Sequence, residues 1–139
     1  MKTLKVMLVR EGEGEQLSAK TPALVAEAVK YLENSDREQF VVLHLNTKNK
    51  INAIETVSIG SLNLSVVTPR EIFKGAILHN SASIILVHNH PSGDPTPSPD
   101  DIITTKKIME AGDILGIRVL DHVIVGDNRY ISLKDAGEI

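Results

Sequence analysis

The sequence of 139 residues contains no cysteine. That absence excludes disulfide bonds, cysteine-ligated zinc sites and a cysteine nucleophile, so a metal site in this chain has to use histidine and carboxylate ligands. Tryptophan is also absent, and there are only two phenylalanines and two tyrosines. The hydrophobic core is therefore expected to consist mainly of aliphatic side chains.

Long apolar runs and a strong net charge are missing as well. No stretch approaches the roughly 20 apolar residues of a membrane-spanning helix, and the N-terminal MKTLKVMLVREGEGE becomes acidic before a signal-peptide core develops. We therefore expect a cytoplasmic protein that does not associate with membranes. The formal charge of −3 gives no overall attraction for nucleic acid. The content of 42% hydrophobic and 24% charged residues is that of one ordinary globular domain.

Hydrophobic patterning predicts an α/β fold with one mixed sheet and helices on its faces. Thr21-Pro22, Thr68-Pro69 and Ser98-Pro99 each place a capping hydroxyl before a proline, which is typical of helix N-termini. The expected helices cover residues 22–33, 69–79 and 99–111, the last of them closed by Gly112. The expected strands cover residues 4–9, 40–45, 51–59, 62–67, 83–88, 117–125 and 130–133.

Two histidines lie where the expected strand at residues 83–88 ends. His88 and His90 are one residue apart, and side chains at positions i and i+2 of a strand lie on the same side. Asp101 follows in the first turn of the third helix. Two histidines and one carboxylate leave zinc a fourth position for water, as catalytic zinc sites require. Simpler explanations stay open, because histidines at strand ends are commonly solvated and a first-turn carboxylate also stabilises a helix.

A zinc hydrolase also needs a group that accepts the proton of water. Glu38 directly precedes the strand at residues 40–45, and a parallel or neighbouring register would bring its carboxylate to the His88 end. Glu55 is the alternative candidate. Ser98 precedes Pro99 and is expected to be the N-cap of the third helix.

The order and spacing of these residues resemble the signature of JAMM metalloproteases, which have MPN or JAB domains. Glu38, then His88-Asn89-His90-Pro91, then Ser98-Pro99-Asp100-Asp101 are similar to the family's Glu, His-x-His-Pro and Ser-x-x-Asp motifs. The string HNHPSGDPTPSPDD, with TPREIFKGAI before it and GIRVLDHVIVG after it, resembles the RadC branch in particular. The resemblance covers residues 20–139, where we expect a JAB/MPN domain, preceded by an edge strand and loop at residues 1–19.

The resemblance implies a fold, a cofactor and a role for each of five residues. The fold would be the three-layer α/β/α sandwich of MPN domains, which is cytidine-deaminase-like. Zn²⁺ would be bound by His88, His90 and Asp101, while Glu38 would be the general acid/base and Ser98 would stabilise the oxyanion. The implied reaction is hydrolysis of a peptide or isopeptide bond in a protein substrate by zinc-activated water.

The other three histidines receive less specific expectations. His44 and His79 are expected to be structural or surface residues. His122 lies in the RadC-like string GIRVLDHVIVG, and a role in packing or behind a metal ligand is as consistent with its position as no role at all.

Two other functions stay open, and the oligomeric state is not predicted. RadC proteins are traditionally described as DNA-repair proteins, which suggests a nuclease or repair accessory. The acidic net charge argues against that role, as does the expected lack of the helix-hairpin-helix region of full-length RadC proteins. A non-catalytic MPN scaffold is the third possibility, although such scaffolds typically lose ligand positions that this chain retains. A nucleic-acid surface would require six basic residues to gather on one face: Lys48, Lys50, Lys106, Lys107, Arg118 and Arg129.

Overall fold

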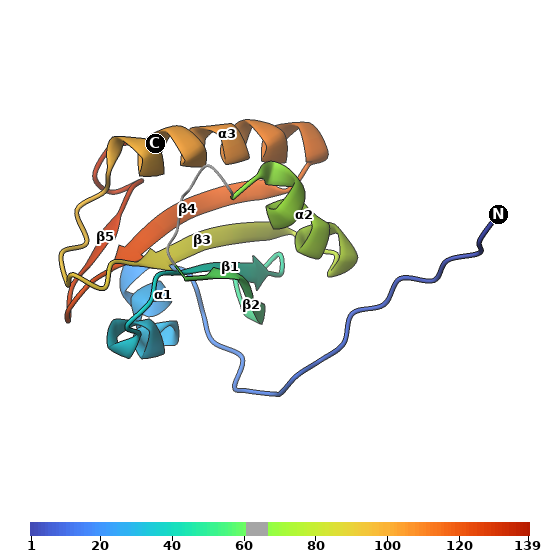
Figure 1. The fold of residues 1–139 in the computed structure, drawn as a ribbon, viewed down its shortest axis with the longest axis horizontal. Coiled ribbons are helices and arrows are strands. Elements are labelled where there is room, and N and C mark those ends of the chain that lie inside the picture. The colour runs from blue at the N-terminus through green and yellow to red at the C-terminus, as the bar shows by residue number, and fades with distance from the viewer. Residues whose placement is uncertain (61–66) are drawn as a thin grey trace.

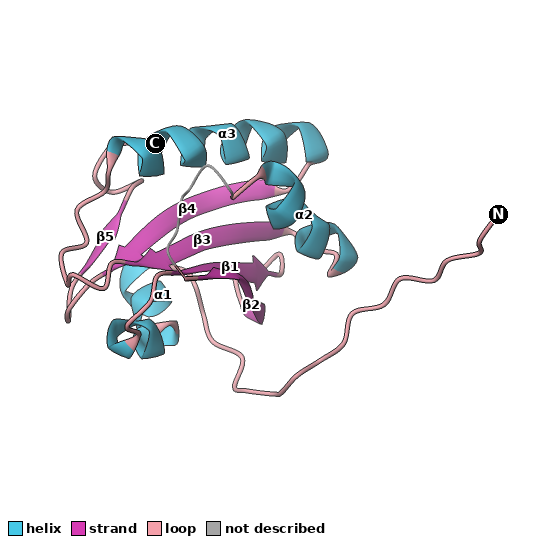
Figure 2. Cartoon of the chain, in the orientation of Figure 1, coloured by secondary structure: helices cyan, strands magenta, loops and turns pink. Residues whose placement is uncertain are grey.

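The computed structural model describes residues 1–60 and 67–139. Its strands are β1 (Gln39–Leu45), β2 (Ile51–Ile59), β3 (Ser83–Asn89), β4 (Arg118–Val125) and β5 (Tyr130–Ser132). They form one sheet in the order β2-β1-β3-β4-β5, shown in Figure 1 and, coloured by secondary structure, in Figure 2. β3 and β4 are parallel, while the other neighbouring pairs are antiparallel, so the predicted mixed sheet is confirmed.

The helices begin where the sequence predicts. They are α1 (Pro22–Ala28), the 3-10 helix η1 (Lys30–Asn34), α2 (Pro69–Leu78) and α3 (Pro99–Leu115). The side chains of Thr21, Thr68 and Ser98 each accept a hydrogen bond from an amide three residues later. Each cap satisfies an amide that the first helical turn leaves unpaired, and the following proline already has a helical φ. Among the described residues, no helix has both the length and the apolar character needed to cross a membrane.

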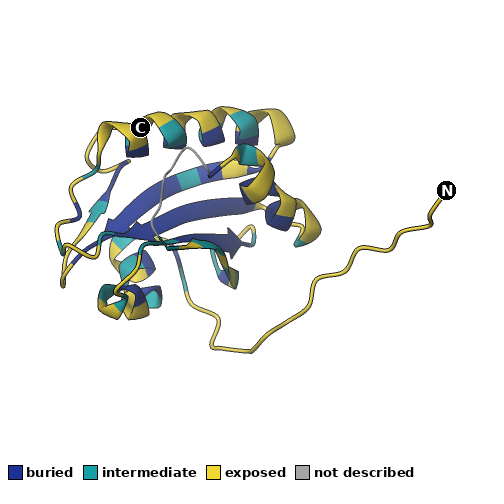
Figure 3. Ribbon diagram, in the orientation of Figure 1, coloured by how far each residue is buried: buried dark blue, intermediate teal, exposed yellow. Residues whose placement is uncertain are grey.

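The sheet separates two hydrophobic cores. Val41 and Leu43 of β1 pack with α1 and η1 on one face, whereas Phe40 and Val42 pack with α2 and α3 on the other. This division follows from the alternation of side chains along a strand. Figure 1 shows α2 and α3 on one side of the sheet and α1 on the other, and Figure 3 shows that β3 is buried along its length. The predicted three-layer α/β/α architecture is therefore confirmed.

The predicted edge strand at residues 4–9 is wrong. Residues 1–17 form no strand, and Leu4, Val6 and Val9 are largely exposed. The polar sequence EGEGE between this segment and the domain carries it away from the sheet, where it finds no strand to pair with among the described residues. Only Ser18 forms an isolated bridge, with Lys50.

Two helices end elsewhere than predicted. The first changes from α to 3-10 geometry after Ala28, while α3 continues through Gly112 and ends at Gly116, whose φ of 72° provides the left-handed cap. Gly112 has a packing role instead, because a Cβ there would lie 2.4 Å from the carbonyl oxygen of Ile117. The predicted strand at residues 62–67 lies outside the described residues, apart from Val67, which is buried but not in a strand.

Candidate metal centre

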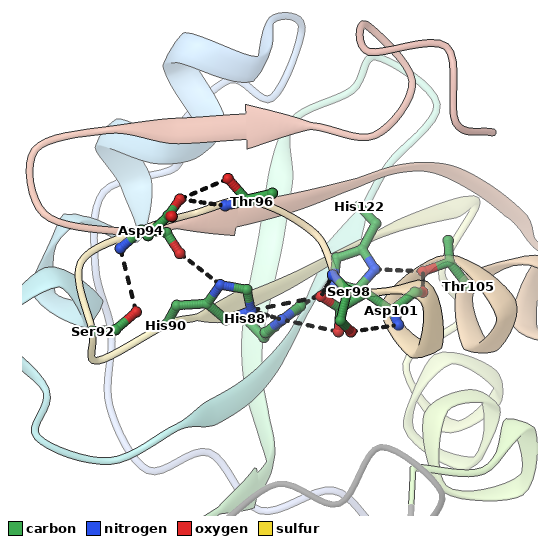
Figure 4. Close-up of polar contacts among 9 residues, drawn as sticks. All are labelled: His88, His90, Ser92, Asp94, Thr96, Ser98, Asp101, Thr105 and His122. Carbon is green, nitrogen blue, oxygen red and sulfur yellow. Dashed lines mark hydrogen bonds and ion pairs between the residues drawn. The ribbon is translucent and has the colours of Figure 1, made fainter.

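The candidate ligands meet at the edge of the sheet where the parallel strands β3 and β4 end. The amide of His90 donates to the carbonyl of Val125 at the end of β4 (2.9 Å), so the pairing continues just beyond β3. The chain then passes through residues 91–98 and enters α3, whose first turn contains Asp101. Carboxyl ends of parallel strands are a common place for sites in α/β proteins. Figure 4 shows His88, His90 and Asp101 pointing toward one another at this edge.

The spacing of the three side chains suits a small divalent cation. The Nε2 atom of His88 lies 3.0 Å from Nε2 of His90 and 3.4 Å from Oδ1 of Asp101. The Nε2 atom of His90 lies 3.6 Å from Oδ2 of Asp101. Ligands at zinc bond lengths in a tetrahedral site are roughly 3.4 Å apart. Within residues 1–60 and 67–139, this is the one group of three or more such side chains close enough to hold a metal ion.

Asp101 combines a capping role with its place in the ligand group. Its backbone amide donates to Oγ of Ser98 (3.1 Å), and its Oδ2 accepts from the amide of Ser98 (2.8 Å), which makes a capping box. The second carboxylate oxygen, Oδ1, faces His88. The capping role is therefore confirmed, and it is compatible with a place for Asp101 in a metal-binding group. Ser98 is exposed, and a hydroxyl that accepts a cap bond keeps its own proton for donation.

The three side chains differ in protonation. Burial lowers the pKa of His88 to about 4, so this ring is neutral at pH 7. The pKa of His90 is raised, first by its hydrogen bond with Asp101, and the charge of Glu38 adds to the effect. Burial alone would raise the pKa of Asp101, but the hydrogen bond with His90 and the nearby His88 bring it to about 2. The carboxylate is thus ionised, and a proton on His90 lies where a cation would bind.

The loop before α3 orients His90. Its Nδ1 atom donates to the carbonyl oxygen of Asp94 (2.8 Å), which leaves Nε2 facing the other two ligands. The turn between β4 and β5 holds this loop, because the carbonyl of Gly93 accepts from the amide of Asp127 (2.9 Å) and from Nη2 of Arg129 (3.0 Å). Gly93 has a φ of 89°, a conformation that favours glycine. The position of His90 therefore depends on a turn more than 30 residues later in the chain.

A second set of contacts lies behind His88. Its Nδ1 atom is 2.7 Å from Nε2 of His122, and Nδ1 of His122 is 2.6 Å from Oγ1 of Thr105. Thr105 is one helical turn after Asp101 and donates to the carbonyl oxygen of Asp101 (2.6 Å). The ring of Phe40 stacks on His88 and meets His122 edge-on. The structure therefore gives His122 a role, since its ring packs against Phe40 and contacts a candidate ligand.

Asn89 fixes the segment that contains Glu38. Its Oδ1 atom accepts from the amide of Gln39 (2.7 Å), and its Nδ2 atom donates to the carbonyl of Arg37 (2.9 Å). Glu38, half-buried, is therefore held on both sides by the residue between the two candidate histidine ligands. The register that achieves this is antiparallel, with Phe40 opposite His88.

The alternative base, Glu55, belongs to another part of the molecule. Its Oε1 atom contacts Nε2 of His44 (2.8 Å), and His44 lies opposite Ile84 near the start of β3. His88 lies four positions after Ile84 along β3, which corresponds to roughly 13 Å. Glu55 is therefore not placed beside the candidate ligands.

The sequence prediction missed Asn89 and Thr105 as parts of the site. Thr105 follows Asp101 by four residues on the same helical face, which is a usable local signal. Asn89 lies between the two histidines, but alternation alone points its side chain away from them. Its contact with residues 37 and 39 depends on strand pairing across fifty residues and has no local signal.

Comparisons with known proteins agree with the geometry. A family model described as "RadC-like JAB domain" matches residues 19–138. A UPF0758 protein of Caldanaerobacter subterraneus subsp. tengcongensis is 58% identical over 134 residues, covering 94% of this chain and 56% of that protein. Another, from Desulforamulus reducens, is 63% identical over 108 residues, covering 78% of this chain and 48% of that protein. This chain spans about half the length of these relatives.

Proposed function

Since the chain belongs to the family of RadC-like JAB domains, we propose that it is a zinc-dependent hydrolase of the JAMM type that cleaves peptide or isopeptide bonds. The single observation that supports this most directly is the convergence of His88, His90 and Asp101 at donor spacings that fit a tetrahedral ion. Asn89, the residue between the two candidate histidine ligands, holds the main chain on both sides of Glu38. This arrangement supports a Lewis acid at the ligand group with a carboxylate next to it.

The ligand set has the composition of a catalytic zinc site. Two neutral imidazoles and one carboxylate provide three protein ligands and leave one position open, whereas structural zinc sites use four protein ligands. Zinc bound there would supply a Lewis acid that activates water and polarises a carbonyl group. His88 and Asp101 are almost fully buried, while 17% of the His90 side chain is exposed to solvent. Solvent therefore reaches the ligand group on the His90 side.

Glu38 and Ser98 have the remaining two roles in this proposal. The carboxylate of Glu38 accepts a proton from the attacking water and delivers it to the leaving amine. Its charge already acts on His90, which is consistent with a position next to the ligands. The hydroxyl of Ser98 donates to the developing oxyanion while its oxygen continues to cap α3. The loop at residues 91–98 stays in place through the contact of Asp94 with His90 and the contacts of Gly93 with the turn between β4 and β5.

The test measures zinc content and hydrolysis on one purified preparation. We expect about one zinc per chain and cleavage of peptide or isopeptide substrates. Glu38→Gln should lower the rate by about 10² to 10⁴, the usual contribution of a general acid or base, with zinc content unchanged. Glu33→Gln makes the same chemical change in η1 and should leave the rate unaltered.

Full zinc occupancy without hydrolysis of any such bond would contradict the proposal. Binding to DNA that weakens steeply with salt would instead support the nucleic-acid alternative.

A further inference from the structure

A continuous row of hydrogen bonds connects the two candidate ligands of β3 and α3 through the interior. It runs from Nδ1 of His88 to Nε2 of His122 (2.7 Å), from Nδ1 of His122 to Oγ1 of Thr105 (2.6 Å), and from Thr105 to the carbonyl oxygen of Asp101 (2.6 Å). His122 and Thr105 are essentially inaccessible to solvent. Figure 4 shows His122 behind the ligand group, between His88 and Thr105.

The carbonyl at one end decides the direction of every bond in the row. A carbonyl oxygen only accepts, so the single hydroxyl proton of Thr105 is used in the bond to Asp101. The contact between Thr105 and His122 then needs its proton from Nδ1 of His122. Neither hydrogen-bond partner of the His122 ring is a carboxylate, and the ring is buried, which favours its neutral form. A neutral imidazole with its proton on Nδ1 has an accepting Nε2.

The same logic fixes the tautomer of His88. Because Nε2 of His122 accepts, the proton between the two rings belongs to Nδ1 of His88. A neutral His88 then carries a lone pair on Nε2, the atom that lies 3.0 Å from His90 and 3.4 Å from Asp101. This is the atom that would bind a metal ion.

We propose that His122 and Thr105 are positioning residues that hold His88 in the Nδ1–H tautomer, so that its Nε2 lone pair is available to a metal ion. The inference deepens the proposed function and rests on the metal site that it assumes. Metal-bound histidines commonly donate their second N–H to a carboxylate, a backbone carbonyl or water. Here the acceptor is a neutral histidine, so His122 and Thr105 add no charged group behind His88.

The most conservative test removes one hydroxyl group. In Thr105→Val, Nδ1 of His122 loses its acceptor, and the proton of His122 is free to move to Nε2, where it would oppose the Nδ1–H form of His88. Long-range ¹H–¹⁵N spectra of the zinc-free protein at pH 8 should show His88 with its proton on Nδ1 in the wild type. In Thr105→Val we expect a mixture of tautomers and a zinc dissociation constant raised about 10-fold, at the lower end of the range for groups behind metal ligands.

Thr104→Val is the matched control, because it makes the same change on the neighbouring residue of α3. It should alter neither the tautomer nor the dissociation constant. The proposal is overturned if wild-type His88 carries its proton on Nε2, or if folded Thr105→Val behaves as the control does.

A second pair of variants separates hydrogen bonding from packing. His122→Phe keeps an aromatic ring without an acceptor and should raise the zinc dissociation constant about 10- to 100-fold. His122→Gln supplies a side-chain carbonyl to accept from His88, so it should recover most of the affinity. If the two variants bind zinc equally, the acceptor is not what matters and the proposal fails. None of these measurements uses a substrate, so absence of hydrolysis would remove the proposed reaction and leave this inference standing.

Discussion

Both ends of the paired strands β1 and β3 hold histidines next to a carboxylate, but only one end has the geometry of a metal site. At the His88 end, two Nε2 atoms and a carboxylate converge. At the other end, Nδ1 of His44 contacts Oγ of Ser81 (2.7 Å) and its Nε2 contacts Glu55 (2.8 Å), so both ring nitrogens are used in separate pairwise contacts. The difference shows that ligand residue types do not define a site; the direction of their lone pairs does.

The second histidine at the His44 end reinforces the point. The ring of His79 meets that of His44 edge-on at a centroid distance of 5.4 Å, and within residues 1–60 and 67–139 the two rings do not belong to a group close enough to hold a metal ion. At the His88 end, by contrast, the second nitrogen of each histidine has its own partner. Asp94 contacts His90 and His122 contacts His88, and these contacts leave both Nε2 atoms facing inward.

The largest expected difference between the two ends is in zinc affinity, when one histidine at each end is replaced by alanine. His90→Ala removes a ligand and should raise the zinc dissociation constant by more than about 100-fold, beyond the effect of changes behind the ligands. His44→Ala should leave zinc affinity unchanged but lower the free energy of unfolding by about 2–4 kcal/mol, because it creates a cavity at a buried position and removes the contacts to Ser81 and Glu55. Chelator competition and urea denaturation measure the two quantities. Equal loss of zinc affinity in both variants would contradict the distinction between the ends.

Lowering the pH should weaken zinc binding at the His88 end. The pKa of His90 is raised above 6.5 by Asp101, so its proton competes with the cation below that raised value. The affinity for zinc is therefore constant at high pH, where His90 is already deprotonated. As the pH is lowered, the affinity begins to fall while the pH is still above 6.5, by up to about tenfold per pH unit. Titrations from pH 9 to 6 provide the measurement, and His44→Ala should follow the same curve. A flat profile down to pH 6 would show that no such proton is displaced.

Two glycines offer a smaller contrast. A Cβ at Gly126 would lie 2.3 Å from the carbonyl oxygen of Gly93, which is backbone, so Gly126→Ala must displace the loop that orients His90. We expect a loss of about 1–3 kcal/mol in the free energy of unfolding, together with weaker zinc binding. At Gly75 the clash is with Oε1 of Glu55, the end of a side chain. Gly75→Ala should therefore cost less than about 1 kcal/mol and leave zinc affinity intact, as thermal denaturation and chelator competition can verify.

Local sequence signals predicted much of the fold. The three hydroxyl-proline pairs located the helix starts, because a cap and a fixed φ act within one turn. The His88 and His90 pair was found from strand alternation, and its approach to Asp101 agrees with the expectation. Helix ends were less predictable. Gly112 lies inside α3, where a Cβ would clash with the carbonyl oxygen of Ile117, and the helix continues to Leu115 with Gly116 as its cap.

The features that local sequence signals do not explain depend on pairings between distant parts of the chain. Glu38 was placed by family resemblance, whereas its physical anchor is Asn89, fifty residues later in the chain. The apolar segment at residues 4–9 has the composition of a strand, but composition does not supply a neighbouring strand. His122 and Thr105 meet only because β4 returns parallel to β3 after α3.

Asn89 has a practical consequence for anyone who would move this site into another protein. Its amide holds the main chain at residues 37 and 39 and leaves the side chain of Glu38 for other contacts. A graft that copied the three ligands and a nearby glutamate would therefore lack the support that fixes where the glutamate starts. The smallest transferable unit is a pair of adjacent antiparallel strands, with His-Asn-His at the end of one and the backbone of residues 37–39 at the start of the other.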